Sequence, residues 1–276
     1  DKAVNVATTD VLTDGTITFS DTTAPTVTAF TSSTGNGSYK DTDTINITAT
    51  MSEAVVGGTA VSVTLGTGDA ISLSTTNSGS SLSGTYTVGS GDTSSDLTVN
   101  SFTITSGQDL FGNALTSTTL PSGANLADNK DIVIDTTAPT ATLSSVAYNT
   151  TTGVLTFTGT NFDTVGVGSS VDVKTYLDWG KLYWDIDSLG AGPSSSSDVT
   201  FAQSEIASAF VTNATTLTVT LEGAKATSLA GTAGFGAPNI ANTGALADNF
   251  DVTAGFIRDK AVNVATTDVL TDGTIT

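Results

Sequence analysis

The eighteen residues Asp259–Thr276 read DKAVNVATTDVLTDGTIT, and residues Asp1–Thr18 have the same sequence letter for letter. The offset between the two copies is 258 residues, because Asp259 is equivalent to Asp1. Such an identity does not arise by chance, and self-similarity at a fixed period is typical of repeat architectures. We therefore expect the chain to be a window on a longer series of near-identical repeats.

A second repeated motif marks where each domain begins. The sequence DTTAPT occupies Asp21–Thr26 and returns at Asp135–Thr140. Its proline fixes φ and favours an extended residue before it, which suits a stiff connection into a first strand. The sequence thus predicts three segments: residues 1–20 as the closing strand of a preceding repeat, a first domain over 21–134, and a second over 135–276.

Within both domains, apolar residues alternate with polar ones, and clusters of Gly, Asp, Asn and Ser separate the runs. Short strands rich in Thr and Val at this spacing predict an all-β fold of two tandem Ig-like antiparallel β-sandwiches. Short helical turns near 204–209 or 224–229 are further possibilities in the second domain. The expected strands are 27–30, 44–51, 61–65, 71–74, 82–88, 97–105, 114–120 and 132–134 in the first domain, and 140–147, 153–159, 170–179, 181–187, 198–201, 216–221, 251–257 and 263–276 in the second.

The composition is strongly acidic, with 27 Asp and Glu against 8 Lys and Arg and a net charge of −19. Phosphate contacts need a basic surface, so we expect no nucleic-acid partner. The chain has no Cys and no His, which removes the usual zinc and copper ligands and the catalytic triads built on imidazole or thiol. Paired carboxylates in short turns do not by themselves indicate an enzyme, and no apolar run is long enough to predict membrane insertion.

Acidic residues fall at comparable places in both domains. Successive strands of an antiparallel sandwich reverse direction, so the start of the first strand, the loop after the second and the loop between the last two share one pole. Calcium takes six to eight oxygens at about 2.3–2.6 Å, and close carboxylates repel one another unless an ion bridges them. We therefore predict calcium at the domain joints. The predicted ligands are Asp21, Glu53, Asp109 and Asn113 in the first domain, Asp135, Asp163, Asp259 and Asn263 in the second, and Asp41 and Asp43 at the opposite pole of the first.

The alternative is that Asp and Asn occupy these turns because their side chains cap backbone groups. A weaker candidate is Asp185-Ile-Asp187, which begins like an EF-hand loop but has Leu189 at the third ligand position.

Three motifs resemble the bacterial Ig-like domains of giant secreted and surface proteins: the DTTAPT openings, Ser52-Glu-Ala-Val55 and the turn Asp109-Leu-Phe-Gly-Asn113. Those domains occur in tandem in adhesins and related extracellular fibres, often with calcium at the joints. The resemblance implies an extracellular or cell-surface location and a structural role in a fibre, sheath, S-layer or adhesin stalk, with copies of the chain as partners. The second domain departs from the pattern, because Asn161-Phe-Asp163 replaces the Ser-Glu-Ala-Val element and Val262 precedes Asn263 where the first domain has Gly112.

A binding role is the alternative function. Extra loops at 188–198 and 223–249 would let the second domain contact a glycan or another cell-surface partner, as in an adhesin module. Its aromatic residues Tyr176, Trp179, Tyr183 and Trp184 invite the same interpretation. However, strand alternation places Trp184 with Leu182 on one face, so we expect Trp184 in the core and Tyr183 outside.

Overall fold

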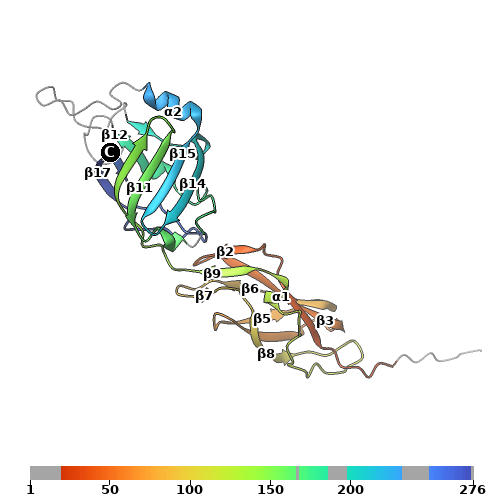
Figure 1. The fold of residues 1–276 in the computed structure, drawn as a ribbon. Coiled ribbons are helices and arrows are strands. Elements are labelled where there is room, and N and C mark those ends of the chain that lie inside the picture. The colour runs from red at the N-terminus through yellow and green to blue at the C-terminus, as the bar shows by residue number, and fades with distance from the viewer. Residues whose placement is uncertain (1–19, 166–167, 186–197, 232–248, 275–276) are drawn as a thin grey trace, which may run out of the picture. The chain divides into compact units, whose positions relative to one another are not determined.

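The computed structural model describes residues 20–165, 168–185, 198–231 and 249–274 (Figure 1). These residues form two compact units. Unit 1 comprises the described residues up to Thr34 together with Asn46–Tyr86 and Thr98–Asn129. Unit 2 comprises Gly35–Ile45, Thr87–Leu97 and the described residues from Lys130 onward. The sequence-based boundary at residues 134 and 135 stays a prediction, and the expected strand over 1–20 lies outside the described residues apart from Ser20.

Unit 1 is built on a six-stranded sheet in the order β1-β3-β6-β5-β4-β8. Phe30 of β1 and Phe102 of β8 lie on the two edge strands, yet their rings meet edge to face at 5.7 Å. The sheet therefore folds over on itself, and its alternating apolar side chains are buried inside. The strands are β1 (Val27–Thr31), β3 (Thr44–Val55), β4 (Ala60–Leu65), β5 (Ala70–Ser74), β6 (Gly79–Thr87) and β8 (Val99–Ser106).

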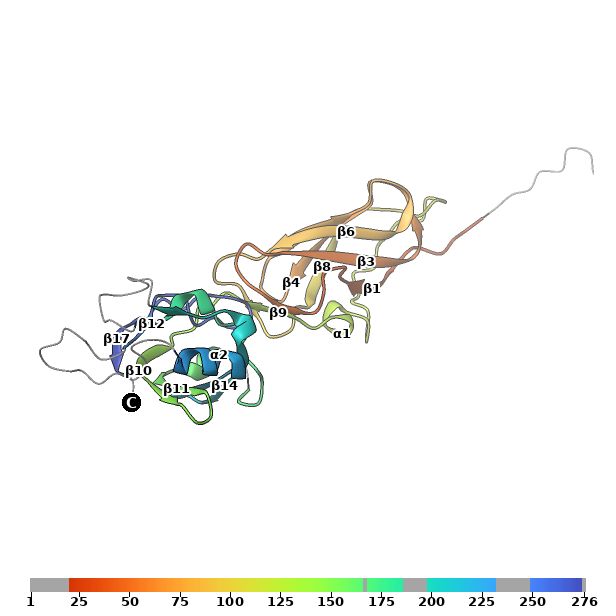
Figure 2. The same cartoon turned by 90° about the horizontal axis from the view of Figure 1, so that it is seen from above.

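No strand forms over 114–120, where Ala114 makes an isolated bridge to Gln108, and a short helix, α1 (Leu126–Asn129), follows further along the chain (Figure 2). Asparagine side chains tie it to the sheet. The Asn125 amide nitrogen donates to the Val99 carbonyl at 2.9 Å, and the Asn129 amide nitrogen donates to the Phe30 carbonyl at 2.8 Å. The expectation of a strand at 114–120 was wrong, because beyond the bridge at Ala114 the chain forms no ladder with a neighbouring strand.

Three short strands form a separate sheet within unit 2: β2 (Gly37–Tyr39), β9 (Ile132–Asp135) and β7 (Thr93–Ser94), with β9 in the middle. β2 and β9 pair in parallel, from Gly37 opposite Ile132 to Tyr39 opposite Ile134. The sequence predicts antiparallel sheets, and the parallel pairing of β2 with β9 departs from that prediction. Parallel neighbours need a long connection, which the chain between residues 39 and 132 supplies.

The rest of unit 2 is a β-sandwich of two four-stranded sheets with antiparallel pairing throughout. Aromatic side chains fill the space between the sheets. Trp184 contacts Phe250 with ring centroids 4.6 Å apart, and Phe157 of the facing sheet meets Phe250 at 6.4 Å. Trp184 is buried, which confirms its expected place in the core. One sheet is β10 (Thr142–Asn149), β11 (Val154–Thr160), β15 (Thr216–Leu221) and β14 (Ile206–Asn213), and the other is β13 (Val199–Thr200), β12 (Leu182–Asp185), β16 (Asn249–Val252) and β17 (Leu270–Thr274).

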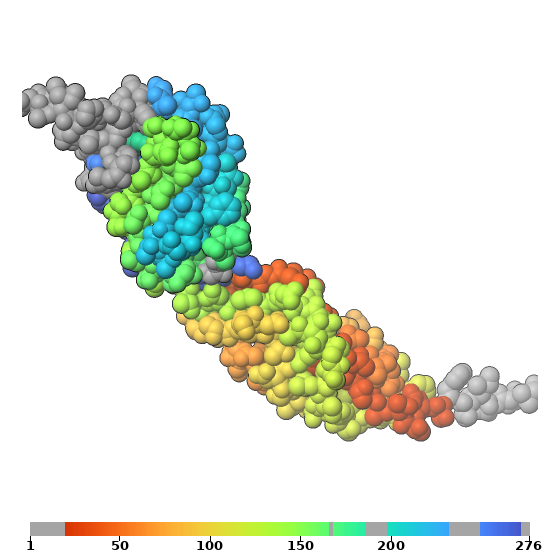
Figure 3. All heavy atoms as spheres, viewed as in Figure 1, coloured from red at the N-terminus to blue at the C-terminus, as the bar shows by residue number. Residues whose placement is uncertain are grey.

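β14 covers a segment for which the sequence suggests a helical turn. A bulge between Ile206 and Ser208 interrupts its pairing with β15, so that Ala209 and Val211 join Ile206 on the buried side. The bulge breaks the two-residue alternation on which a strand prediction depends. On the face of unit 2 drawn in Figure 3, side chains cover this sheet without a deep hollow.

Short helices complete unit 2. α2 (Gly223–Ala230) covers one end of the sandwich and buries Leu229, as the possible turn at 224–229 suggests (Figures 1 and 2). The expected strand at 170–179 is instead irregular, with one bridge from Asp172 to Phe210. The remaining helices are the 3-10 turns η1 (Phe162–Val165), η2 (Trp179–Lys181) and η3 (Gln203–Glu205).

Candidate metal centre

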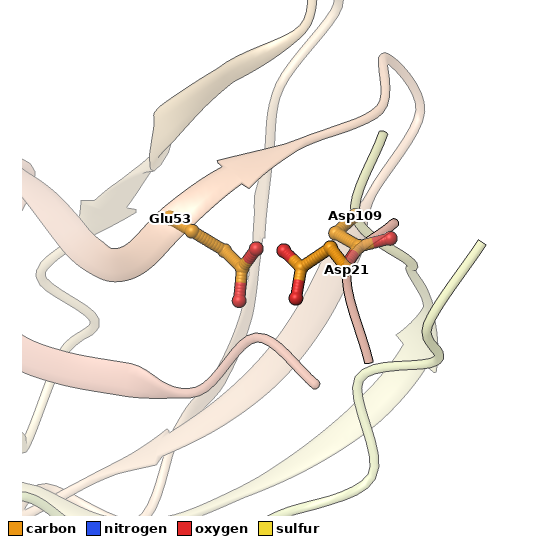
Figure 4. Close-up of side chains that lie close together, drawn as sticks. All are labelled: Asp21, Glu53 and Asp109. Atoms are coloured by element: carbon orange, nitrogen blue, oxygen red, sulfur yellow. The ribbon is translucent and has the colours of Figure 1, made fainter. Parts of the chain in front are cut away.

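Three acidic side chains from distant parts of unit 1 converge on one point. Asp21, Glu53 and Asp109 each place a carboxylate oxygen within 4.8 Å of the other two (Figure 4). Asp109 is buried, with 1% of its surface exposed, and the other two are partly exposed. Within the part of the chain that the structure describes, no other group of three Asp, Glu, His or Cys residues is this close.

Backbone pairing brings the three segments together. Glu53 lies near the end of β3, where Val55 forms a bridge with Asp109 in the loop after β8. The chain before β1 is held against β3 because the Thr26 amide donates to the Ser52 hydroxyl at 2.9 Å. Asp21 turns the chain just before that point by accepting the Thr23 amide at 2.8 Å.

The loop Asp109–Asn113 is organised around the Asp109 carboxylate. One of its oxygens accepts the amides of Phe111 and Asn113, both at 2.8 Å. The Asn113 side-chain nitrogen donates to the other oxygen at 2.6 Å and to the Asp21 carbonyl at 3.0 Å. Asn113 is predicted as a metal ligand, and in the structure its amide nitrogen joins two of the acidic segments and orients Asp109.

The cluster is electrostatically unbalanced. The pKa of Glu53 is raised by loss of solvation and by the negative charges of Asp21 and Asp109, and a protonated Glu53 would donate to Asp21. Loss of solvation also acts to raise the pKa of Asp109, but its hydrogen bonds from Asn113, Phe111 and Gly112 outweigh this and lower it. Asp109 therefore ionises more readily than an ordinary aspartate, and Glu53 ionises less readily than an ordinary glutamate.

Unit 2 contains a second copy of this hydrogen-bonded loop. The Asn263 side-chain nitrogen donates to the Asp259 carboxylate at 2.9 Å and to the Asp135 carbonyl at 2.8 Å. The Asn263 amide also donates to Asp259, at 2.9 Å. Asp135, Asp259 and Asn263 thus correspond to Asp21, Asp109 and Asn113. Loss of solvation and the charge of Asp135 raise the pKa of Asp259 despite its hydrogen bonds from Asn263 and Ala261.

The unit 2 loop lacks a third carboxylate. The Thr140 amide donates to the Thr164 hydroxyl at 3.1 Å, as Thr26 does to Ser52 in unit 1. The residue after Thr164 is Val165, which is apolar and has 2% of its surface exposed, whereas the residue after Ser52 is Glu53. The predicted ligand Asp163 lies in η1, is exposed and joins no group of three acidic residues in the described parts of the chain.

The other predicted ligands form turns. The Asp43 carboxylate accepts the Lys40 amide at 2.9 Å in a turn where Thr42 has a φ of 71°. Asp41 is exposed, and neither residue belongs to a group of three acidic residues in the described chain. The geometry of Asp43 is that of turn capping. In the EF-hand-like stretch, Asp185 is buried in β12, and Asp187 lies outside the described residues.

The aromatic residues of the alternative binding function are largely internal. Trp179 is buried against Phe256 with ring centroids 5.6 Å apart, and its indole nitrogen donates to the Lys174 carbonyl. Tyr183 is half-buried, with its hydroxyl bonded to the Gly180 carbonyl. Most of the loops 188–198 and 223–249 lies outside the described residues.

The comparisons with known proteins identify no relative: no protein-family model matches the chain, and no curated protein matches it. Among the described residues, no helix is long and apolar enough to cross a membrane.

Proposed function

We propose that the chain is a structural repeat unit of an extracellular fibre, sheath, S-layer or adhesin stalk, and that calcium bound by Asp21, Glu53 and Asp109 stiffens unit 1 where the chain enters it. The convergence of these three carboxylates is the observation that supports the proposal most strongly. Its mechanism is mechanical, because an ion held by three distant segments removes their relative freedom. The partners are further copies of the repeat, and each unit would be an Ig-like module.

The donor set suits calcium. It consists of oxygens alone, and three carboxylates supply up to six of the six to eight ligands that calcium takes. Asp109 is already oriented by Asn113, so binding requires little rearrangement there. The pKa of Glu53 is raised first by loss of solvation and then by repulsion from Asp21 and Asp109, and a divalent cation would relieve that repulsion.

The two units differ in a way that makes the proposal specific. Because Val165 follows Thr164 whereas Glu53 follows Ser52, the loop of unit 2 offers two carboxylates, from Asp135 and Asp259, and no third among the described residues. Calcium is therefore proposed at the start of unit 1 and not at the equivalent place in unit 2. A tandem array would alternate ion-bound and ion-free joints, with one calcium per 258-residue period.

Thermal unfolding with and without calcium tests the proposal. At about 10 mM calcium, roughly 100 times a dissociation constant of ~0.1 mM, binding would stabilise unit 1 by about 2.7 kcal/mol. For a unit of this size we expect its calorimetric transition to rise by roughly 10–20 °C relative to chelator. Both tryptophans, Trp179 and Trp184, lie in unit 2, so tryptophan fluorescence reports that unit separately.

Two variants separate the site from general charge effects. Glu53→Gln should abolish the calcium-dependent rise, whereas Asp163→Asn removes one charge from an exposed position and should leave the rise unchanged. A rise that survives in Glu53→Gln, or a wild-type chain that melts identically in calcium and chelator, would refute the calcium site.

A further inference from the structure

The described part of the segment 259–276 closes unit 2 and is held there by contacts with the preceding chain. Its strand β17 pairs with β16, with Phe250 opposite Gly273 and Val252 opposite Leu270. Without β17, β16 would be an edge strand with unpaired backbone groups.

A buried carboxylate anchors the middle of this segment. Asp268 has none of its surface exposed, and its two oxygens accept the amides of Gly255 at 3.0 Å and Ile257 at 2.6 Å. These two amides belong to a turn in which Gly255 has a φ of 95°. Removing the carboxylate would leave two inward-facing donors without their acceptor, which is costly in a protein interior.

Three more contacts extend the attachment on the N-terminal side of Asp268. The Ala265 amide donates to the Ile257 carbonyl at 2.9 Å, and the Thr267 hydroxyl donates to the Ala141 carbonyl at 2.8 Å. The Asn263 side chain reaches the Asp135 carbonyl. Ala261 and Ala265 are buried. The segment therefore carries its own set of polar and apolar anchors.

Residues 1–18 carry the same set, because their sequence is identical: Asn5, Ala7, Thr9 and Asp10 correspond to Asn263, Ala265, Thr267 and Asp268. An identical peptide makes identical contacts with the same acceptor. We propose that unit 2 of one chain accepts residues 1–18 of a second copy in place of its own residues 259–276. This inference rests on the proposed function, in which the partners are further copies of the repeat. It deepens that function by naming the segment and the surface through which two copies would join.

The geometry of such an exchange is head to tail. Residues 1–276 hold one donor segment before unit 1 and one acceptor in unit 2, so the contact between two copies is heterologous and propagates unless a ring closes. In the intact chain, residues 259–276 are tethered to unit 2 at an effective concentration of about millimolar, which favours them over residues 1–18 of a second molecule. Exchange between chains is therefore favoured at high local density or when the local copy is weakened.

Weakening one copy while leaving the other intact gives a direct test in the full-length chain. Asp268→Ala removes the anchor from the C-terminal copy only, and residues 1–18 of a second molecule should then occupy unit 2. We expect wild type to sediment as a 27.6 kDa monomer at micromolar concentration and Asp268→Ala to form dimers and longer chains. The matched control is Asp10→Ala/Asp268→Ala, in which neither copy is competent and association should be lost.

A peptide measurement covers the case in which Asp268→Ala loosens unit 2. A synthetic peptide of residues 1–18 should bind Asp268→Ala, dissolve its oligomers and restore the tryptophan fluorescence of Trp179 and Trp184, at least tenfold more effectively than the same peptide with Asp10→Ala. The milder variant Thr267→Val provides the same comparison with less risk to folding.

The inference fails if Asp268→Ala stays monomeric and the peptide neither binds nor restores fluorescence, or if the double variant associates equally well. All measurements are made in chelator, so the outcome is independent of calcium at Glu53. If no exchange occurs but calcium still raises the transition of unit 1, this inference alone is overturned. If exchange occurs but calcium does not raise that transition, the calcium site alone is overturned.

Discussion

Gly112 and Val262 occupy the same position in the two copies of one loop, and both have a positive φ, 92° and 66° respectively. Each precedes the asparagine that ties the loop to the start of its unit. Glycine adopts this conformation without strain, whereas a β-branched residue does so at a cost. The hydrogen bonds of Asp259 and Asn263 thus hold Val262 in a backbone conformation that its side chain disfavours.

We expect Val262→Gly to stabilise unit 2 by about 1 kcal/mol, because relief of backbone strain exceeds the added entropy of the unfolded chain. The measurement is chemical denaturation followed by tryptophan fluorescence. Val264→Gly is the matched control: Val264 is equally exposed, at 41% against 40%, but its φ is not positive. Val264→Gly should destabilise unit 2. If both variants change the stability of unit 2 in the same way, the backbone of Val262 is not strained.

Glu53→Gln should have opposite effects in the two ionic conditions. In chelator it removes a carboxylate whose ionisation is opposed by burial and by Asp21 and Asp109, so the transition of unit 1 should rise. In calcium the variant lacks a ligand and should melt below wild type. Calorimetry in both buffers checks the crossover, and a variant that melts lower in both would show that Glu53 has a purely structural role.

The pH dependence of the ion-free chain follows from the same carboxylates. Folding raises the pKa of Glu53 above its ordinary value of 4.5, so the folded state binds this proton more tightly and stability falls as pH rises through the raised pKa. Asp109 acts in the opposite sense, since its lowered pKa contributes stability that is lost as pH falls through it. In chelator, the difference in melting temperature between Glu53→Gln and wild type should increase with pH. A difference that stays constant with pH would contradict this account.

Asn113 should position the Asp109 loop in unit 1, and Asn263 should position the Asp259 loop in unit 2. Asn113→Ala removes two hydrogen bonds and should cost unit 1 about 1–2 kcal/mol, and Asn263→Ala should cost unit 2 a similar amount. Tryptophan fluorescence should detect the second change and not the first, whereas calorimetry should detect both. Calcium affinity should fall in Asn113→Ala only, and a fall in both would place a cation in unit 2 as well.

Gly159 permits the close approach of β10 and β11. A Cβ atom there would lie 1.8 Å from the Thr142 carbonyl oxygen, a backbone atom that cannot move aside. We expect Gly159→Ala to destabilise unit 2 by about 3 kcal/mol or more, because overpacking displaces backbone. Gly223→Ala is the control, since its Cβ meets nothing within 4 Å and alanine favours helix α2. Equal loss of stability in both variants would contradict the steric argument.

Much of the β-structure could be predicted because it depends on local pattern. β1, β4, β5, β11 and β15 alternate apolar and polar residues between turn-forming clusters, and each lies within a residue or two of its expected bounds. β14 was missed because a bulge between Ile206 and Ser208 shifts its buried face. The parallel pairing of β2 and β9 joins segments almost a hundred residues apart, and no local pattern specifies it.

For the candidate site, the sequence alone determined which residue types recur, where the DTTAPT and Asp-x3-Asn motifs lie, and that two copies of an eighteen-residue segment exist. Strand reversal in an antiparallel fold was enough to place Asp21, Glu53 and Asp109 near one another. Only the tertiary structure decided that Asn113 donates to this cluster, that Thr164 accepts from Thr140 as Ser52 does from Thr26, and that Asp268 is a buried anchor. The physical reason is that hydrogen-bond partners and residue equivalence depend on register between segments distant in sequence, and composition and periodicity do not encode that register.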